Sequence, residues 1–343
     1  MRIEGGSRQR DCESHARPVE RSEKSEESKE RTQRYERQPI GLPLVRVFAR
    51  VAVVIWLAAC RSRVTALATP PAPGSRCAVT YATPDSSHVV TSDVTLFWRV
   101  FDEPSELNLQ AYLDRGSVGL HDAAATRIGS ARDLVMQIQT DHARYERVRA
   151  ATLRAGEAEP AIRASFRKLE SLYAGARFAD VYFVIGRFIV GGVALPHGIV
   201  VGAEMYSDPK QLPAIVAHEL VHCQQTASPD GQTLLARAFN EGSADFVGEL
   251  ISGAQINSAA HAYGLAHEHA LWSEFKQHRH DTAYYPWMYG PRADGLPNDL
   301  GYFIGYRIAQ AYYDRARDKR AAVREIIRTN YVDRLLRASG YDP

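Results

Sequence analysis

Apolar residues recur at helical spacing along much of the chain after residue 91. They lie three and four positions apart in residues 92–101 and 107–113, and again in residues 133–153 and 161–173, with a break at residues 156–160. Because apolar positions with this period fall on one side of a helix, the pattern predicts four amphipathic helices.

The period changes in the middle of the chain. Residues 181–185 are β-branched and aromatic, and residues 198–202 contain three consecutive β-branched residues. A turn rich in glycine and with one proline, residues 191–196, separates them. This part of the chain predicts either a β-hairpin or a pair of neighbouring strands, and it is the only clear strand signal in the sequence.

Helical periodicity returns in the C-terminal half. Asp208-Pro209 is a good helix start, and that helix should reach about Thr226, where residues 228–231 stop it. Further helices are expected over residues 232–251 and 260–278, then from Asp299, as the N-cap, to Arg317, followed by two short helices. The predicted fold class is α+β, mostly helical with a small β-sheet.

The first 44 residues differ from the rest, because they are dominated by charged and polar side chains. Such a stretch cannot bury enough apolar surface to offset its ordering entropy, so residues 1–44 are expected to form a disordered, solvated tail. Acidic residues alternate with the basic ones, which argues against a nucleic-acid-binding arm. With 42 Lys and Arg against 40 Asp and Glu in the whole chain, no nucleic-acid partner is expected.

Residues 45–60 have the layout of a secretory signal. Two arginines precede a short apolar run, and small residues lead to Cys60. Leu57-Ala58-Ala59-Cys60 resembles a bacterial lipobox, which implies a lipid anchor on Cys60. The apolar run is far shorter than the roughly 20 residues that span a bilayer, and a buried core helix is the alternative. Either translation begins near residue 44 and the tail is not made, or the signal does not function.

The remaining boundaries follow from composition. Prolines and a glycine in residues 61–78 predict a flexible linker, and the folded domain is expected over residues 79–343. The chain has four cysteines without Cys-x-x-Cys spacing, which argues against a cysteine zinc site. Cys223 is interpreted as a small buried hydrophobe, and a disulfide with Cys77 stays open for an oxidising compartment.

Candidate chemistry lies in the helix that follows Asp208. His218 and His222 are four residues apart, so both imidazoles project from one side of a helix and can share a metal ion. Glu219 can still reach a water in the open position of that ion and act as its general base. The His-Glu-x-x-His pattern is short, and two surface histidines on an amphipathic helix are the alternative.

The next predicted helix supplies the missing ligand. Glu241 and Asp245 are also four residues apart, in a stretch that is otherwise mostly apolar. Buried carboxylates need a partner, and a catalytic zinc ion takes three protein ligands, for which two histidines and a glutamate are an established set. We therefore predict one Zn²⁺ ion bound by His218, His222 and Glu241. Asp245 should accept a hydrogen bond from the second nitrogen of one histidine.

The paired motifs resemble those of the gluzincins, the thermolysin-type clan of zinc metallopeptidases. More particularly, residues 112–117, 180–186, 202–205 and 299–306 resemble the family of predicted zinc-dependent proteases related to the gliding-motility lipoprotein GldB. The resemblance covers about residues 91–341. It implies a zincin-like domain with the small sheet beside the active-site helix, and an edge strand that could hold an extended substrate.

A metallopeptidase also needs a donor for the developing oxyanion. Tyr302 and Tyr306 share one side of the helix after Asp299 and are the leading candidates, ahead of His267 and His269. Each could equally be a packing or surface residue.

The predicted function is a zinc metallopeptidase acting on a peptide or protein substrate outside the cytoplasm, lipid-anchored to the bacterial cell envelope. A non-catalytic zinc-binding envelope lipoprotein, acting in an assembly or motility complex, is the alternative from another class. A hydrolase of a non-peptide amide is a third.

Overall fold

The computed structural model describes residues 76–226, 232–290 and 295–343. The predicted tail and signal peptide, with Cys60, lie outside the described residues, as does most of the linker. Helices dominate the described part and accompany one four-stranded sheet, which confirms the α+β class. Among the described residues, no helix is both long enough and apolar enough to cross a membrane.

The helices before the sheet lie close to the positions that the apolar periodicity predicts. They are α1 (Ser92–Phe101), α2 (Glu106–Arg115), α4 (Ala131–Thr152) and α5 (Glu159–Leu172), with a short α3 (Val118–Ala123) that the pattern did not reveal. In α1, Val94, Phe97, Trp98 and Phe101 recur at helical spacing and are all buried. Their burial explains why this segment is a helix packed on the core.

The sheet has the strand order β1-β2-β4-β3, with β1 (Val89–Val90), β2 (Val181–Val184), β3 (Gly192–Leu195) and β4 (Gly198–Gly202). Strands β2 and β4 are parallel neighbours, so residues 181–185 and 198–202 form a pair of strands and not a hairpin. The hairpin is β3–β4, and β3 occupies the segment predicted as a turn. Its Ala194 and Leu195 are buried, which explains the strand despite the glycines before it.

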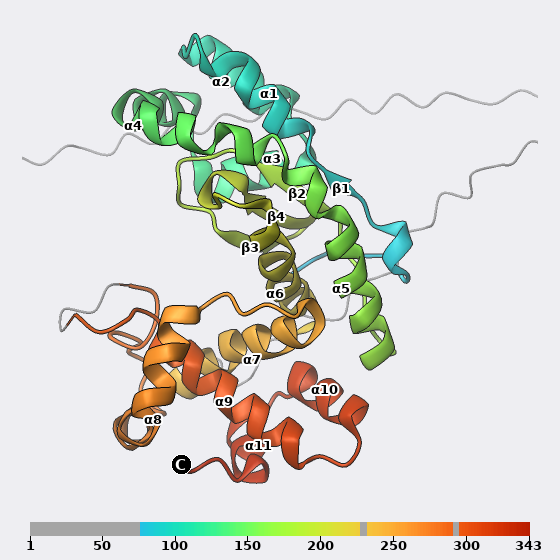
Figure 1. Ribbon diagram of the computed structural model, residues 1–343, viewed down its shortest axis with the longest axis vertical. Coiled ribbons are helices and arrows are strands. Elements are labelled where there is room, and N and C mark those ends of the chain that lie inside the picture. The colour runs from blue at the N-terminus through green and yellow to red at the C-terminus, as the bar shows by residue number, and fades with distance from the viewer. Residues whose placement is uncertain (1–75, 227–231, 291–294) are drawn as a thin grey trace, which may run out of the picture. The chain divides into compact units, whose positions relative to one another are not determined.

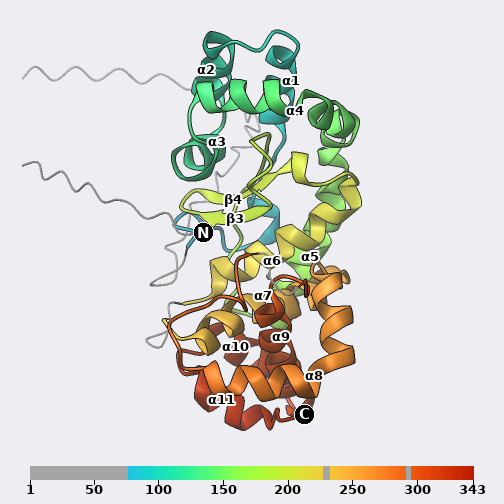
Figure 2. The same ribbon diagram turned by 90° about the vertical axis from the view of Figure 1, so that its left-hand side faces the viewer.

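Six helices follow the sheet: α6 (Leu212–Gln224), α7 (Leu234–Ser252), α8 (Ser258–His278), α9 (Leu300–Arg315), α10 (Lys319–Arg328) and α11 (Val332–Ser339). Helix α6 packs against β3 and β4, and α3 lies on the opposite side of the sheet (Figure 1). Helix α7 packs on α6, and α9 packs on α7 (Figure 2). The central helix α6 therefore connects the sheet to the helices of the C-terminal half.

Glycines allow the closest of these helix contacts. A side chain at Gly242 would meet the backbone of α9, and one at Gly305 would meet the backbone oxygen of Ala238 on α7. Gly242 therefore faces α9. Gly248 is the residue of α7 that faces the backbone of His218.

Helix α9 begins without the predicted side-chain cap. Asp299 adopts a left-handed conformation (φ 60°) and its side chain makes no cap bond. Its Oδ1 instead accepts the backbone N–H of Tyr289 at 2.7 Å. The polar side chain thus orders the preceding loop.

Candidate metal centre

Helix α6 buries the two predicted histidines completely within the fold. From Val216 to Gln224 every residue of the helix is buried, because the sheet and α7 cover it from different sides. The imidazoles of His218 and His222 lie edge to face, with their centroids 4.6 Å apart. Their Nε2 atoms are 3.0 Å from each other.

Helix α7 brings a carboxylate to the same point. Glu241 Oε2 lies 3.0 Å from His222 Nε2 and 3.6 Å from His218 Nε2. The ligand atoms of the three residues all lie within 4.8 Å of one another, and all three residues are buried. Two helices separated by a loop thus bring three potential metal ligands, two histidines and a glutamate, to one position.

The distal nitrogen of His218 is held by Asp245. The Asp245 Oδ1 atom lies 2.7 Å from His218 Nδ1, and Asn257 donates to Oδ2 at 2.6 Å. Since a carboxylate only accepts, Nδ1 carries a proton, and Nε2 is the nitrogen that would bind a metal ion.

His222 has a different partner, which the sequence analysis missed. Its Nδ1 lies 2.7 Å from Gln225 Oε1, and the same oxygen accepts from Asn240 Nδ2 at 2.8 Å. The Gln225 amide group donates to the backbone oxygen of Asn240. Because Gln225 presents its oxygen, His222 is also protonated on Nδ1. The only signal in the sequence was the glutamine three residues after His222, at the end of the helix.

Burial and charge act in opposite directions on the site. Burial by itself would lower the pKa of His218, but hydrogen bonds to Asp245 and Glu241 raise that pKa well above its ordinary value. Burial would raise the pKa of Glu241, but the His222 charge and hydrogen bonds to both histidines hold it well below. Both directions show that the cluster favours a positive charge beside the Glu241 carboxylate.

These residues fit a zinc ion. With Zn–N and Zn–O distances of about 2.0–2.1 Å, tetrahedral ligand atoms lie about 3.4 Å apart. The observed separations of 3.0 and 3.6 Å bracket that value. In addition, both Nδ1 atoms already have partners, so the two Nε2 atoms and a carboxylate oxygen are the atoms that face one another. A bound cation would take the place of the positive charge that Glu241 favours beside it.

Glu219 directly follows His218 on α6 and lies against the edge strand β3. The residue is 5% exposed, and a side chain added at Gly192 of β3 would come within 3.0 Å of Glu219 Oε1. The pKa of Tyr206 is raised, mainly by burial and next by the charge of Glu219. The glycine therefore gives the carboxylate its space at the side of β3.

The tyrosines predicted as oxyanion donors occupy different surroundings. The pKa of Tyr302 is strongly raised, first by burial and then by the Glu241 charge, and its ring lies 6.4 Å from that of Tyr289. Tyr306 packs against His261, at 4.4 Å between centroids, and against Phe246. His267 and His269 lie on the exposed side of α8.

Tyr289 is the hydroxyl group that the structure places against a predicted ligand, and no pattern in the sequence indicated it. Its Oη lies 3.4 Å from Glu241 Oε1. Burial and the Glu241 charge raise the pKa of Tyr289 to about 12, so the hydroxyl keeps its proton at neutral pH. The residue lies in the loop before α9, in a left-handed conformation with φ 63°.

The N-terminal edge of the described chain is fixed to the same region. A disulfide joins Cys77 to Cys223, the residue directly after His222. The neighbouring Arg76 donates through Nη2 to Asn240 Oδ1 at 2.9 Å and lies 3.9 Å from Glu241 Oε1. Cys223, interpreted from the sequence as a small buried hydrophobe, is therefore a disulfide-bonded cysteine.

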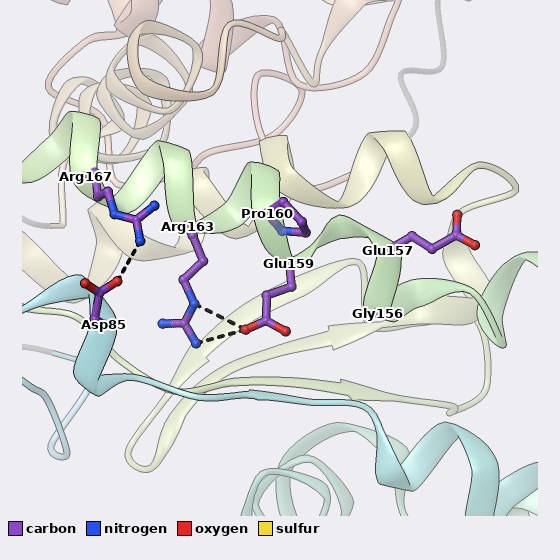
Figure 3. A pocket seen from close by; sticks show the side chains of 7 residues that line it. All are labelled: Asp85, Gly156, Glu157, Glu159, Pro160, Arg163 and Arg167. Carbon is purple, nitrogen blue, oxygen red and sulfur yellow. Dashed lines mark hydrogen bonds and ion pairs between the residues drawn. The ribbon is translucent and has the colours of Figure 1, made fainter.

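A separate hollow of about 660 Å³ lies along α5, away from these residues (Figure 3). Its guanidinium groups already have anionic partners: Arg163 pairs with Glu159 at 3.0 Å, and Arg167 with Asp85 at 2.8 Å. With its charges satisfied internally, the hollow offers no group for chemistry.

Comparison with known proteins agrees with the geometry. Residues 184–331 match the family model described as Predicted Zn-dependent protease (DUF2268). The matched segment contains the three candidate ligands, Glu219 and Tyr289, but not the first five helices. No curated protein and no solved structure matches the chain. The match supports a zinc protease family for this part of the chain.

Proposed function

We propose that the chain is a zinc-dependent metallopeptidase of the gluzincin type, related to the GldB-like predicted proteases, that hydrolyses peptide bonds with Glu219 as general base. One observation carries the proposal: the Nε2 atoms of His218 and His222 and a carboxylate oxygen of Glu241 lie close enough together to share an ion, and Glu219 directly follows His218 on the same helix. The zinc protease description of the matching family supports the same conclusion.

The chain's own residues divide the work. His218, His222 and Glu241 would hold one zinc ion, which when bound supplies Lewis-acid activation of the carbonyl group and the attacking water. Glu219 takes the proton from that water and passes it to the leaving amine. Tyr289, with its proton retained, donates a hydrogen bond to the developing oxyanion. The edge strand β3 pairs with an extended substrate beside Glu219.

We further propose that the enzyme acts outside the cytoplasm, lipid-anchored to the bacterial envelope through Cys60. The Cys77–Cys223 disulfide supports this location, since disulfides persist in oxidising compartments.

The substitution Glu219→Gln tests the proposal. Removing a general base typically costs about 10²–10⁴ in rate, so cleavage of a peptide library should fall by that factor while zinc binding is retained. Glu249→Gln, on α7 but not among the converging ligand atoms, is the matched control and should cleave normally. If the zinc-loaded chain cleaves no peptide, or if Glu219→Gln cleaves as fast as the control, the proposed activity is refuted. A zinc-loaded chain that cleaves no peptide would favour a non-catalytic zinc-binding lipoprotein.

A further inference from the structure

Helix α7 carries a cation one turn before the predicted ligand. Arg237 and Glu241 are four residues apart, so they project from the same side of the helix. The Arg237 guanidinium carbon lies 5.8 Å from the ring centroid of Tyr284. Its Nε is buried without a hydrogen-bond partner. Burial lowers the Arg237 pKa, but a hydrogen bond to Tyr284 and the nearby charges, Glu241 among them, raise it on balance. The guanidinium group therefore keeps its charge and has one donor that no described residue accepts from.

A second guanidinium approaches the same end of α7 from another part of the chain. Arg76 is fixed by its bond to Asn240 Oδ1 and by the disulfide at the adjacent Cys77. Its side chain is 39% exposed, so part of it is accessible from the surroundings. The nearest carboxylate, Glu241, is a predicted metal ligand, and its charge would be taken up largely by the ion.

Tyr289 connects the two arginines. Its hydroxyl group lies at Glu241 Oε1, the carboxylate oxygen that faces away from the histidines. Arg76 Nη2 lies 3.9 Å from the same carboxylate oxygen. The ring of Tyr289 lies 6.3 Å from that of Tyr284, on which Arg237 rests. The two cations therefore flank the outer side of the metal centre.

The other carboxylate of this region has its own partner. Asp299 accepts the backbone N–H of Tyr289. The pKa of Asp299 is raised, mainly by burial. This acid is therefore committed to the loop.

We propose that Arg237 and Arg76 form a subsite that binds a carboxylate group of the substrate next to the scissile bond. The inference rests on the proposed peptidase function and specifies its substrate class. A guanidinium group matches a carboxylate with two parallel hydrogen bonds and forms stronger bonds than neutral donors do. The carboxylate is either the C-terminus of the substrate, which would make the enzyme a carboxypeptidase, or an Asp or Glu side chain.

The test uses the full chain carrying Glu219→Gln and loaded with zinc, so that substrates bind without being cleaved. Fluorescence anisotropy compares the binding of four labelled peptides of equal length, in two pairs. The first pair is one apolar peptide with a free C-terminal carboxylate or with a C-terminal amide. The second pair is one amidated peptide that carries either Asp or Asn at its centre. Charged hydrogen bonds of this kind are worth about one power of ten in affinity, so one charged peptide should bind at least about tenfold tighter than its neutral counterpart. The pair that shows the difference identifies the source of the carboxylate.

Two further variants assign the effect. Adding Arg237→Gln, or Arg76→Gln, should abolish most of the preference, whereas Arg324→Gln, on the exposed side of α10, should leave it unchanged. Circular dichroism and zinc content confirm that each variant is folded and loaded. Equal binding of all four peptides, binding of none, or a preference that survives both arginine substitutions would overturn the subsite.

The outcome is separable from the proposed function. Cleavage by the wild-type chain without any carboxylate preference refutes the subsite alone. Carboxylate-dependent binding by a chain that cleaves nothing refutes the peptidase activity and leaves the subsite standing.

Discussion

The predicted ligands are oriented by side chains that never reach the metal position. Asp245 fixes His218, and Gln225 fixes His222, so each imidazole directs Nε2 inward. Asn257 and Asn240 in turn hold these two partners. A ligand whose orientation is set in advance loses less entropy when it binds an ion, so the outer residues should determine affinity.

Gln225→Ala should weaken zinc binding by about 10–100-fold, the usual cost of losing such a partner. Competition with a chromophoric chelator measures the change. Gln277→Ala, an exposed glutamine on α8, is the matched control. An affinity equal to that of the control would show that His222 does not need its amide partner.

Glu204 makes stability depend on pH. It is 1% exposed, and burial raises its pKa from 4.5 to about 7. Its Oε1 accepts the N–H groups of Gly186 and Phe188. The folded state binds the Glu204 proton more tightly than the unfolded state does, so protonated Glu204 stabilises the fold fully below pH 4.5. This stabilisation is lost as the pH rises through about 7. The shift corresponds to about 3 kcal/mol at most.

Glu204→Gln should remove this dependence. The free energy of unfolding of the wild type, relative to the variant, should fall by up to about 3 kcal/mol between pH 4.5 and pH 8. Urea denaturation of both proteins across this range measures the difference. A difference that is constant with pH, or that grows in the opposite direction, would contradict the assignment of a raised pKa.

Among the elements, the contact between α7 and α9 controls the site most closely. It depends on Gly305, whose added side chain would meet the Ala238 backbone oxygen. Because α7 carries Glu241 and Asp245, any displacement of this helix changes the metal ligands.

Gly305→Ala should therefore lower the free energy of unfolding by about 1–3 kcal/mol through overpacking, and weaken zinc binding as well. Gly156→Ala is the control, since a side chain there meets only Thr91 at an ordinary 3.7 Å. Chemical denaturation and zinc titration of both variants test this. Equal stabilities would mean that α9 can move away without cost.

The elements also show how far a sequence can be interpreted without a structure. Helix α7 was located although most of its residues are buried. Periodicity located α1 well, because that helix buries one stripe of apolar residues. It missed β3, because Gly192 and Val193 carry no alternating pattern and the strand is specified by pairing with β4. The ligands followed from i,i+4 spacing, which is local. Tyr289 and Arg76 could not be predicted, since only tertiary contacts bring them to Glu241.

On the scale of the whole molecule, one covalent link closes a long loop. Cys77 and Cys223 are 146 residues apart, and the disulfide holds Arg76 at the metal centre. Cross-links over such distances typically stabilise by about 2–4 kcal/mol by restricting the unfolded chain.

Cys77→Ser should lower the free energy of unfolding by about that amount, and reduction of the wild type should do the same. Thermal denaturation with and without a reductant provides the measurement. The variant itself should be insensitive to the reductant. Unchanged stability on reduction of the wild type would show that the link contributes nothing.

The geometry of α6 and α7 implies one zinc ion held by two imidazoles and one carboxylate. We would measure the zinc-to-protein ratio of the full chain after dialysis against a weak chelator, for the wild type, His218→Ala and Glu241→Ala. The ratio should be close to one for the wild type and close to zero for both variants. A wild type without zinc, or variants that keep it, would show that these residues do not hold the ion.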